Sequence, residues 1–308
     1  MPWFFRIETM ATPLAKPIQT SQVTGACRSS SPRSSSPRSW SPGQLLRSWH
    51  LASLDAPTVA VVWGWAFAWA AHIQLAGWPL ALLGLVVWVV YVGDRLLDAR
   101  AGRDLRERHH FHWRHRRVLI PLTVGAGFAA AAMVRRWVPV IALPQDWAVA
   151  LATLAYFSGV HGRLRLPAAV ARLTALVGWR ECLVGTLFAA GCVLPAWSVD
   201  PLAFPVRLVI LPAGYFAAVA WLNVRAITRW ESGRLLGRVA WVLAAVGMML
   251  GLGLAMVLPR AATLIAAAAV SALLIGWLDR RRERLDPVTL RAAVDLVLLT
   301  PVLLVGVR

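Results

Sequence analysis

The sequence predicts an all-α integral membrane protein, a bundle of about nine transmembrane helices. Of its 308 residues, 58% are apolar and only 15% are charged. The apolar residues form long runs, and the charged residues collect in short segments between those runs. This alternation is typical of polytopic helical membrane proteins, because a helix needs about 20 apolar residues to cross the hydrocarbon core.

Nine apolar ranges are candidate spans, and the shorter ones require tilt or interfacial residues to complete the crossing. They cover residues 56–76, 79–94, 117–134, 147–161, 181–197, 206–222, 238–257, 260–278 and 288–306. We expect residues 49–308 to form this transmembrane domain. The three cysteines show no CxxC or Cys/His spacing, so a cysteine metal site is not expected.

Residues 1–48 are predicted to be a disordered N-terminal segment. Residues 29–42 are rich in Ser, Pro and Arg and contain the sequence SSSPR twice in succession. Such a composition cannot bury enough apolar surface to become ordered. No basic stretch followed by an apolar core and a cleavage site occurs here, so a secretory signal is not expected.

Lys and Arg are distributed asymmetrically between alternate connecting segments. Of the 32 Lys and Arg residues, 27 lie in the segments 1–55, 94–117, 161–181, 223–238 and 279–291. The positive-inside rule therefore places the N-terminus and the four basic loops in the cytoplasm. The expected location is an inner or cell membrane of bacterial type. The net charge of +18 follows this pattern and is accompanied by no nucleic-acid-binding module, so no nucleic-acid partner is expected.

Two aspartates follow the second span. Asp94 and Asp98 lie at the junction between an apolar run and a basic loop, and a spacing of four places them on one helix face. Ionisable groups at a membrane edge are costly and are taken as functional by default. Two neighbouring carboxylates also repel each other unless a positive charge lies between them. A divalent ion, usually Mg²⁺, would satisfy both and could hold a diphosphate.

The loop after Asp98 is dense in arginine and histidine. Guanidinium groups bind phosphate in a bidentate manner, so the loop suits a diphosphate. Its charge equally fits an ordinary cytoplasmic loop in contact with anionic lipid, and both interpretations stay open. The cluster of His109, His110, His112 and His115 matches no closed metal-ligand set, and an interfacial basic loop is the favoured interpretation.

Further polar residues stand at the ends of later spans. Glu181 precedes the fifth span, and Asn223 and Glu231 follow the sixth, so the predicted topology brings all three to the cytoplasmic face. Asp295 lies within the ninth span, where a carboxylate needs a partner. Arg291 precedes it by four residues, and a structural ion pair is expected.

These motifs resemble those of the UbiA superfamily of intramembrane prenyltransferases. The first family motif is Asn-x-x-Asp-x-x-x-Asp, and this chain reads Tyr91-x-x-Asp94-x-x-x-Asp98, with both aspartates kept and Tyr in place of Asn. The second is typically Asp-x-x-x-Asp preceded by Asn. Here Asn223 fits, Ile227 replaces an Asp, and Glu231 stands for the last acid. The resemblance extends from about residue 50 onward, through topology and motif placement.

The resemblance implies a nine-helix bundle around a cavity that is capped on the cytoplasmic side. Mg²⁺ ions held by Asp94, Asp98, Asn223 and Glu231 would bind an isoprenyl diphosphate, with the two aspartates as catalytic residues. The isoprenyl group would pass to an unidentified aromatic or lipophilic acceptor. The resemblance implies that the diphosphate is bound by Arg95, Arg100, Arg103, Arg180 and Arg225. It implies that Tyr91 and Glu181 line the substrate pocket.

Replacement of an Asp by Ile227 implies a weaker second metal site. The chain is then either a divergent enzyme or a catalytically degenerate relative that binds without reacting. A small-molecule transporter on a similar scaffold is the other alternative. Transporters usually place charges near the bilayer midplane, whereas the charges here cluster at one membrane face, which favours an interfacial active site.

Overall fold

A computed structural model describes residues 42–102, 107–140, 143–161, 179–202 and 204–306. These residues form helices and no strand, which confirms the all-α class for the described part of the chain. Of the predicted disordered segment, residues 1–41 lie outside the described residues. Its last residues belong to a helix, α1, so the helical domain begins earlier than residue 49.

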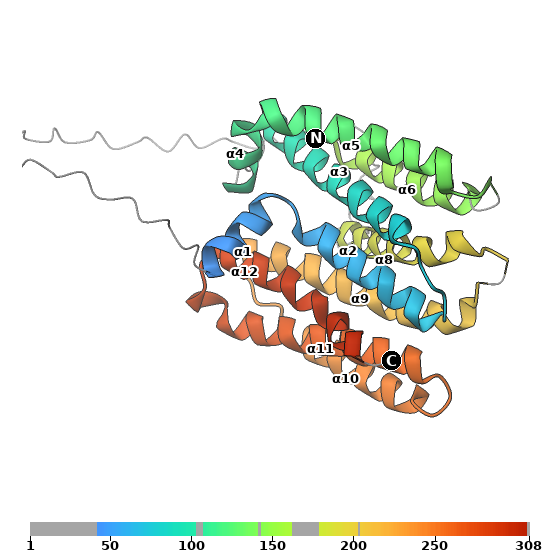
Figure 1. The fold of residues 1–308 in the computed structure, drawn as a ribbon. Helices are drawn as coiled ribbons and strands as arrows, with labels where there is room; N and C mark the ends of the chain where they lie inside the picture. Colours follow the sequence, from blue (N-terminus) through green and yellow to red (C-terminus); the bar gives the residue numbers. More distant parts are fainter. Residues whose placement is uncertain (1–41, 103–106, 141–142, 162–178, 203, 307–308) are drawn as a thin grey trace, which may run out of the picture. The chain divides into compact units, whose positions relative to one another are not determined.

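Figure 1 shows the order of the helices along the chain. Their bounds are α1 Pro42–Leu51, α2 Asp55–Ala70, α3 Gly77–Ala101, α4 Glu107–Arg114, α5 Arg116–Trp137, α6 Leu143–His161, α8 Trp179–Val199, α9 Val206–Glu231, α10 Val239–Leu254, α11 Pro259–Arg281, η2 Arg282–Arg284, α12 Pro287–Leu296 and η3 Val297–Gly306.

Every range predicted to span the membrane overlaps a helix of the structure. Within the described residues, five helices are long and apolar enough to cross a membrane, namely α3, α5, α8, α9 and the α11–η2 segment. Helices α1 and α2 form a pair bent by 88°, which is a sixth candidate if it is one broken span. The chain is therefore an integral membrane protein by helix length and composition, and the count of nine spans stays a prediction.

Large apolar side chains cover much of the outer surface of the bundle. Phe128 on α5 is 74% exposed and Met249 on α10 is 70% exposed. Leu154 on α6 and Leu252 on α10 are similarly exposed. A water-soluble monomer rarely tolerates an extended apolar surface of this kind. In a bilayer the lipid chains cover it, while every helix satisfies its own backbone hydrogen bonds.

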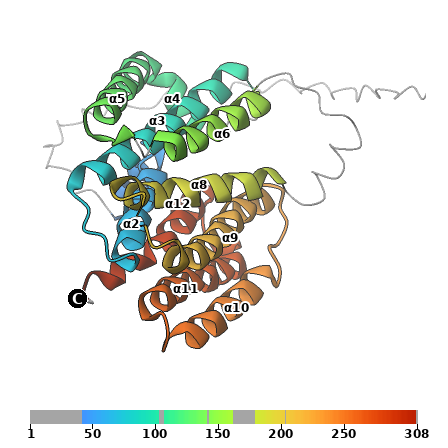
Figure 2. The same ribbon diagram turned by 90° about the vertical axis from the view of Figure 1, so that its right-hand side faces the viewer.

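The aromatic core lies where α2, α9 and η3 meet, and Figure 2 shows α9 between α8 and α11. The rings of Trp63 and Phe216 stack with their centroids 3.8 Å apart, and Phe67 packs against both. The indole N–H of Trp63 donates to the carbonyl of Leu298 at 2.8 Å. This core holds the N-terminal and C-terminal helices together.

Side-chain contacts gather the described basic segments at one end of the bundle, which we call the basic end. Arg47 of α1 pairs with Glu107 of α4, and Arg291 of α12 pairs with Glu231 of α9. At the same end, the carboxylate of Asp279 at the end of α11 accepts a hydrogen bond from the backbone N–H of Leu236, which lies in the α9–α10 connection.

The opposite end is closed by a different set of contacts. Arg260 at the start of α11 donates to the carbonyl of Trp69 at the end of α2, at 2.7 Å. The rings of Trp78 and Trp137 stack where α3 begins and α5 ends. The two sets of connecting segments that differ in Lys and Arg content therefore lie at opposite ends, as the predicted alternation requires.

Helices α8 and α9 approach closely at Gly185. A Cβ atom at this position would lie 2.6 Å from the backbone nitrogen of Trp221 and 2.8 Å from the carbonyl oxygen of Ala217. Because both neighbours are backbone atoms of α9, a larger residue must push the helices apart. Gly185 therefore sets the distance between two helices that line the candidate site.

We expect Gly185→Ala to lower the free energy of unfolding by about 1–3 kcal/mol, because the added methyl group overpacks the α8–α9 contact. Gly191→Ala on the same helix is the matched control, since a Cβ there meets nothing within 4 Å. The control should be neutral or slightly stabilising, as Ala favours helix over Gly. Thermal unfolding in detergent measures both variants, and equal midpoints for the two would contradict this packing.

Candidate functional site

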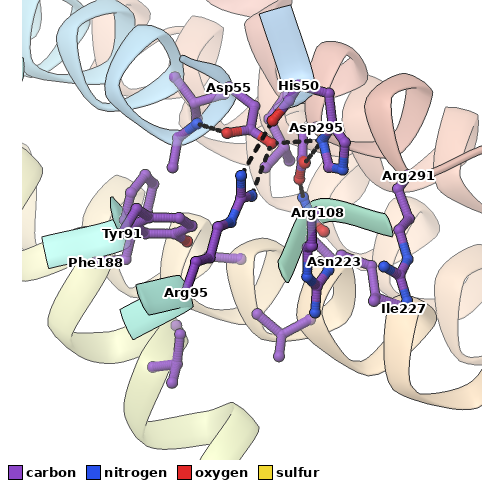
Figure 3. A pocket seen from close by; sticks show the side chains of 17 residues that line it. His50, Asp55, Tyr91, Arg95, Arg108, Phe188, Asn223, Ile227, Arg291 and Asp295 are labelled. Carbon is purple, nitrogen blue, oxygen red and sulfur yellow. Dashed lines mark hydrogen bonds and ion pairs between the residues drawn. The ribbon is translucent and has the colours of Figure 1, made fainter. Parts of the chain in front are cut away.

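A cavity of about 100 Å³ lies at the basic end of the bundle. Helices α2, α3, α8, α9 and α12 contribute to its walls, together with His50 of α1 and Arg108 of α4 (Figure 3). The polar lining residues are His50, Asp55, Tyr91, Arg95, Arg108, Asn223, Arg291 and Asp295. Apolar side chains, among them Phe188 and Leu298, form the rest, so the cavity combines a charged wall with an apolar one.

The bend between α1 and α2 shapes one wall of this cavity. Ser53 lies in the bend with a φ of 59°, in the left-handed region that L-residues rarely adopt, and it is buried. Such a backbone costs about 1–3 kcal/mol and persists only where the surroundings impose it. Arg95 of α3 supplies that restraint, because its Nη1 donates to Ser53 Oγ at 2.6 Å and to the carbonyl of His50 at 3.1 Å.

The bend brings His50 and Asp55 together beside Asp295 of α12. His50 Nδ1 lies 2.7 Å from Asp55 Oδ2 and 3.9 Å from Asp295 Oδ2. His50 and Asp55 are 3% and 1% exposed, so these groups are removed from water. Asn223 Nδ2 donates to Asp295 Oδ1 at 3.1 Å, and Arg95 Nη2 lies 3.6 Å from Asp55 Oδ2. We call His50, Asp55 and Asp295 the histidine–aspartate cluster.

His112 of α4 also supports the bend, through a contact with Ser53. Burial lowers the pKa of His112 to about 4, so the ring is neutral near pH 7. Its Nδ1 lies 2.7 Å from the carbonyl of Arg108, which can only accept, so Nδ1 carries the proton. Nε2 then accepts from Ser53 Oγ at 2.9 Å, and the same hydroxyl accepts from Arg95. The histidine-rich segment thus contributes a buried structural residue.

Three predicted site residues line the cavity, namely Tyr91, Arg95 and Asn223. Tyr91 and Arg95 come from the first motif on α3, and Asn223 comes from the second motif on α9. Glu231 lines an adjoining groove of about 410 Å³ and pairs there with Arg291. The two motifs therefore meet at one end of the bundle.

The two predicted catalytic aspartates lie on α3 and are not among the described residues that line the cavity. Asp98 is half-buried, and its Oδ2 lies 3.8 Å from His109 Nε2. Tyr156 of α6 lies within electrostatic range of Asp94 and Asp98, and also of Arg180 of α8. These carboxylates therefore occupy a second polar region between α3, α6 and α8.

The remaining predicted residues are dispersed around these two regions. Glu181 pairs with Arg225 at 3.6 Å between α8 and α9. Arg100 and Arg180 are exposed, and Arg103 lies outside the described residues. Arg291 was expected to pair with Asp295. In the structure Arg291 pairs with Glu231, whereas Asp295 accepts a hydrogen bond from Asn223.

Asp295 is among the residues that the sequence predicts to need a partner, whereas His50 and Asp55 are not predicted. Asp55 carries a readable signal, because it is a carboxylate at the very start of a long apolar run. His50 carries none, since a single histidine in a basic segment has no distinctive pattern. Its role depends on the bend that follows it.

No family model, no curated protein and no solved structure matches the chain. The resemblance to the UbiA superfamily therefore rests on the two motifs and on the distribution of apolar ranges. Function is inferred from the chemistry of the site.

We expect Arg95→Met to lower the free energy of unfolding by about 3–5 kcal/mol, because it leaves the buried Asp55 carboxylate without its cation and removes two restraints on Ser53. Arg100→Met is the control on the same helix, where the side chain is exposed and an effect within about 0.5 kcal/mol is expected. Chemical unfolding in detergent compares the two. Similar losses in both variants would show that Arg95 does not hold the bend.

The buried His112 makes the docking of α4 sensitive to acid. Its folded pKa of about 4 lies below the ordinary 6.5, so between these values the unfolded chain binds a proton that the folded chain excludes. Stability is therefore complete above pH 6.5, falls as the pH decreases toward 4 and levels off below. Hydrogen exchange of residues 107–114, corrected for the intrinsic rate, should show this loss of protection. His112→Gln should remove that pH dependence, and an unchanged dependence in the variant would contradict the assignment.

Proposed function

We propose that the protein is an integral-membrane prenyltransferase that transfers an isoprenyl group from an isoprenyl diphosphate to a lipophilic acceptor with the help of Mg²⁺. One observation carries this proposal. Tyr91 and Arg95 of the first motif and Asn223 of the second, about 130 residues apart in sequence, line the same cavity at the end of an apolar bundle. A membrane enzyme that acts on a lipid with a charged head needs such a placement.

The cations around the cavity favour a diphosphate headgroup. Arg108 and Arg291 line it from α4 and α12, in addition to Arg95 (Figure 3). Arg95 is engaged at the bend and Arg291 is paired with Glu231, so Arg291 would have to exchange this carboxylate for the phosphate oxygens. Guanidinium groups match phosphate in bidentate geometry and stabilise the negative charge that grows on a departing diphosphate.

The oxygen ligands at α3 fit Mg²⁺. Asp94 and Asp98 lie one helical turn apart and supply carboxylate oxygens, which this ion prefers. Glu231 is committed to an ion pair with Arg291 and Asn223 to Asp295, so either would have to exchange its partner to reach an ion. We therefore assign the Mg²⁺ of the proposed reaction chiefly to Asp94 and Asp98. Because these carboxylates do not line the cavity, the diphosphate would have to extend from the cavity to this part of α3 for the ion to neutralise its charge.

In the proposed reaction the bond between the allylic carbon and the diphosphate oxygen breaks. An allylic cation forms, the acceptor attacks it, and the acceptor releases a proton. The apolar side chains Val184, Phe188 and Leu298 line the cavity and would keep water from the cation. The basic end would face the cytoplasm of an inner or cell membrane, following the distribution of Lys and Arg.

One observation favours a second candidate, a catalytically degenerate relative that binds a phosphorylated isoprenoid without reacting. Ile227 lines the cavity at the position where the second motif carries an Asp. An apolar side chain there removes a metal ligand from the wall itself. Binding by Asp94, Asp98 and the arginines would survive this loss, whereas turnover depends on how well they alone orient the diphosphate.

The test is diphosphate release by the full-length protein in lipid nanodiscs, with allylic diphosphates of increasing length and candidate aromatic or lipid acceptors. Release should require Mg²⁺, and Asp94→Asn or Asp98→Asn should slow it by at least about 100-fold, since each removes stabilisation of the developing charge. Glu283→Gln is the control, because this carboxylate at the basic end is exposed and pairs with the neighbouring Arg282, away from the cavity lining.

The outcomes separate the two candidates. Metal-dependent binding of a donor without release from any acceptor mixture would support the degenerate relative and reject the enzyme. Absence of both binding and release would reject both and favour a transporter.

A further inference from the structure

The histidine–aspartate cluster has a ligand set of its own. Its three members come from α1, α2 and α12, separate from the aspartate pair on α3. One nitrogen and two carboxylate oxygens lie within 4.8 Å of one another. We propose that His50, Asp55 and Asp295 bind one divalent transition-metal ion, with Mn²⁺ and Zn²⁺ as the ions to test.

Hydrogen bonds orient both carboxylates for this role. Asp55 Oδ1 accepts from the backbone N–H of Ala56 at 3.0 Å, and Asp295 Oδ1 accepts from Asn223 at 3.1 Å. The second oxygen of each carboxylate is thereby turned toward His50 Nδ1. Hydrogen-bond partners of this kind fix the orientation of metal ligands and raise their affinity for the ion.

The spacing of the ligand atoms suits a single ion. An ion about 2.0–2.2 Å from each ligand holds the ligand atoms about 3–4 Å apart. The distances from His50 Nδ1 to Asp55 Oδ2 and Asp295 Oδ2 are 2.7 and 3.9 Å. Only small side-chain shifts are needed, and the ion would replace the proton that His50 shares with Asp55.

The charge balance points in the same direction. Two buried carboxylates at this separation repel each other, and burial makes that repulsion stronger than in water. Arg95 contributes one positive charge 3.6 Å from Asp55. With Arg95 counted, one carboxylate charge is left, and a divalent cation between the carboxylates would neutralise it and leave one positive charge in the cluster.

Two further features indicate that the cluster faces a ligand. Tyr91 lines the same cavity, and its hydroxyl makes no hydrogen bond with any residue that the structure describes. Ser53 holds a left-handed backbone between His50 and Asp55. Strained turns of this kind concentrate at functional sites. The hydroxyl of Tyr91 could donate a hydrogen bond to a water or an anion that is bound to the ion.

The ligand types select the class of metal. An imidazole nitrogen with two carboxylates suits Mn²⁺, Fe²⁺ or Zn²⁺, whereas Mg²⁺ prefers oxygen ligands such as the pair on α3. Three protein ligands leave coordination positions open toward the cavity, as in metal sites that bind a substrate or water. The inference concerns metal binding alone and stands whether or not the protein transfers isoprenyl groups.

The test is titration of the metal-free, full-length protein in nanodiscs with Mn²⁺, followed by the loss of the free-ion electron paramagnetic resonance signal. With excess Mg²⁺ present to occupy the oxygen ligands on α3, we expect one Mn²⁺ per chain, displaced by Zn²⁺. His50→Gln and Asp295→Asn should each weaken binding by more than about 100-fold, beyond the effect typical of an outer-shell partner. His110→Gln and Asp286→Asn are matched controls, because both residues are exposed and Asn keeps the helix cap of Asp286.

A spectrum of the wild-type protein tests the inference even if the variants fail to fold. Electron spin echo of the bound Mn²⁺ should show coupling to one imidazole nitrogen. The inference would be overturned if the protein bound neither Mn²⁺ nor Zn²⁺, or if the bound Mn²⁺ showed no coupling to a nitrogen. Loss of binding in Asp98→Asn but not in His50→Gln would assign the ion to α3, which overturns this inference and leaves the proposed function standing.

Discussion

The buried guanidinium of Arg95 is the interaction on which the site depends. It leaves α3, restrains the left-handed Ser53 and lies beside Asp55, so it joins the bend between α1 and α2 to the rest of the bundle. Without this restraint a serine in that conformation would relax. The bend in turn sets the positions of His50 and Asp55. Arg95 therefore acts first as a structural residue, although it lies within a motif that suggests phosphate binding.

A division between apolar surface and polar end organises the whole protein. The sides of the bundle present apolar residues that suit lipid, while the described charged groups concentrate at the basic end, in the cavity and in the adjoining groove. Charges inside a bilayer are costly, so a site at the end of the helices can hold several of them near water. A lipid substrate could then present its head to these charges while its chain stays among apolar side chains.

Two polar regions of different chemistry share this end. The pair on α3 offers carboxylates at a half-exposed helix edge, and the histidine–aspartate cluster offers one nitrogen and two oxygens in a buried bend. Their ligands favour different ions, oxygen-seeking Mg²⁺ in the first and a transition metal in the second. Asn223 connects the second region to the motif on α9, because it orients Asp295. Because the two regions lie at the same end of the bundle, metal binding has to be measured separately for each of them.

The sequence by itself determined the all-α class, the approximate helix ranges and the sorting of basic segments to one end, because apolar length and charge are local properties of the chain. It also identified Tyr91, Arg95 and Asn223, which line the cavity. Only the tertiary structure decided which carboxylates meet. Asp55 and Asp295 are 240 residues apart, and their encounter depends on a strained bend and on the rotation of each helix about its axis. Contacts between distant helices set both, and no local pattern records them.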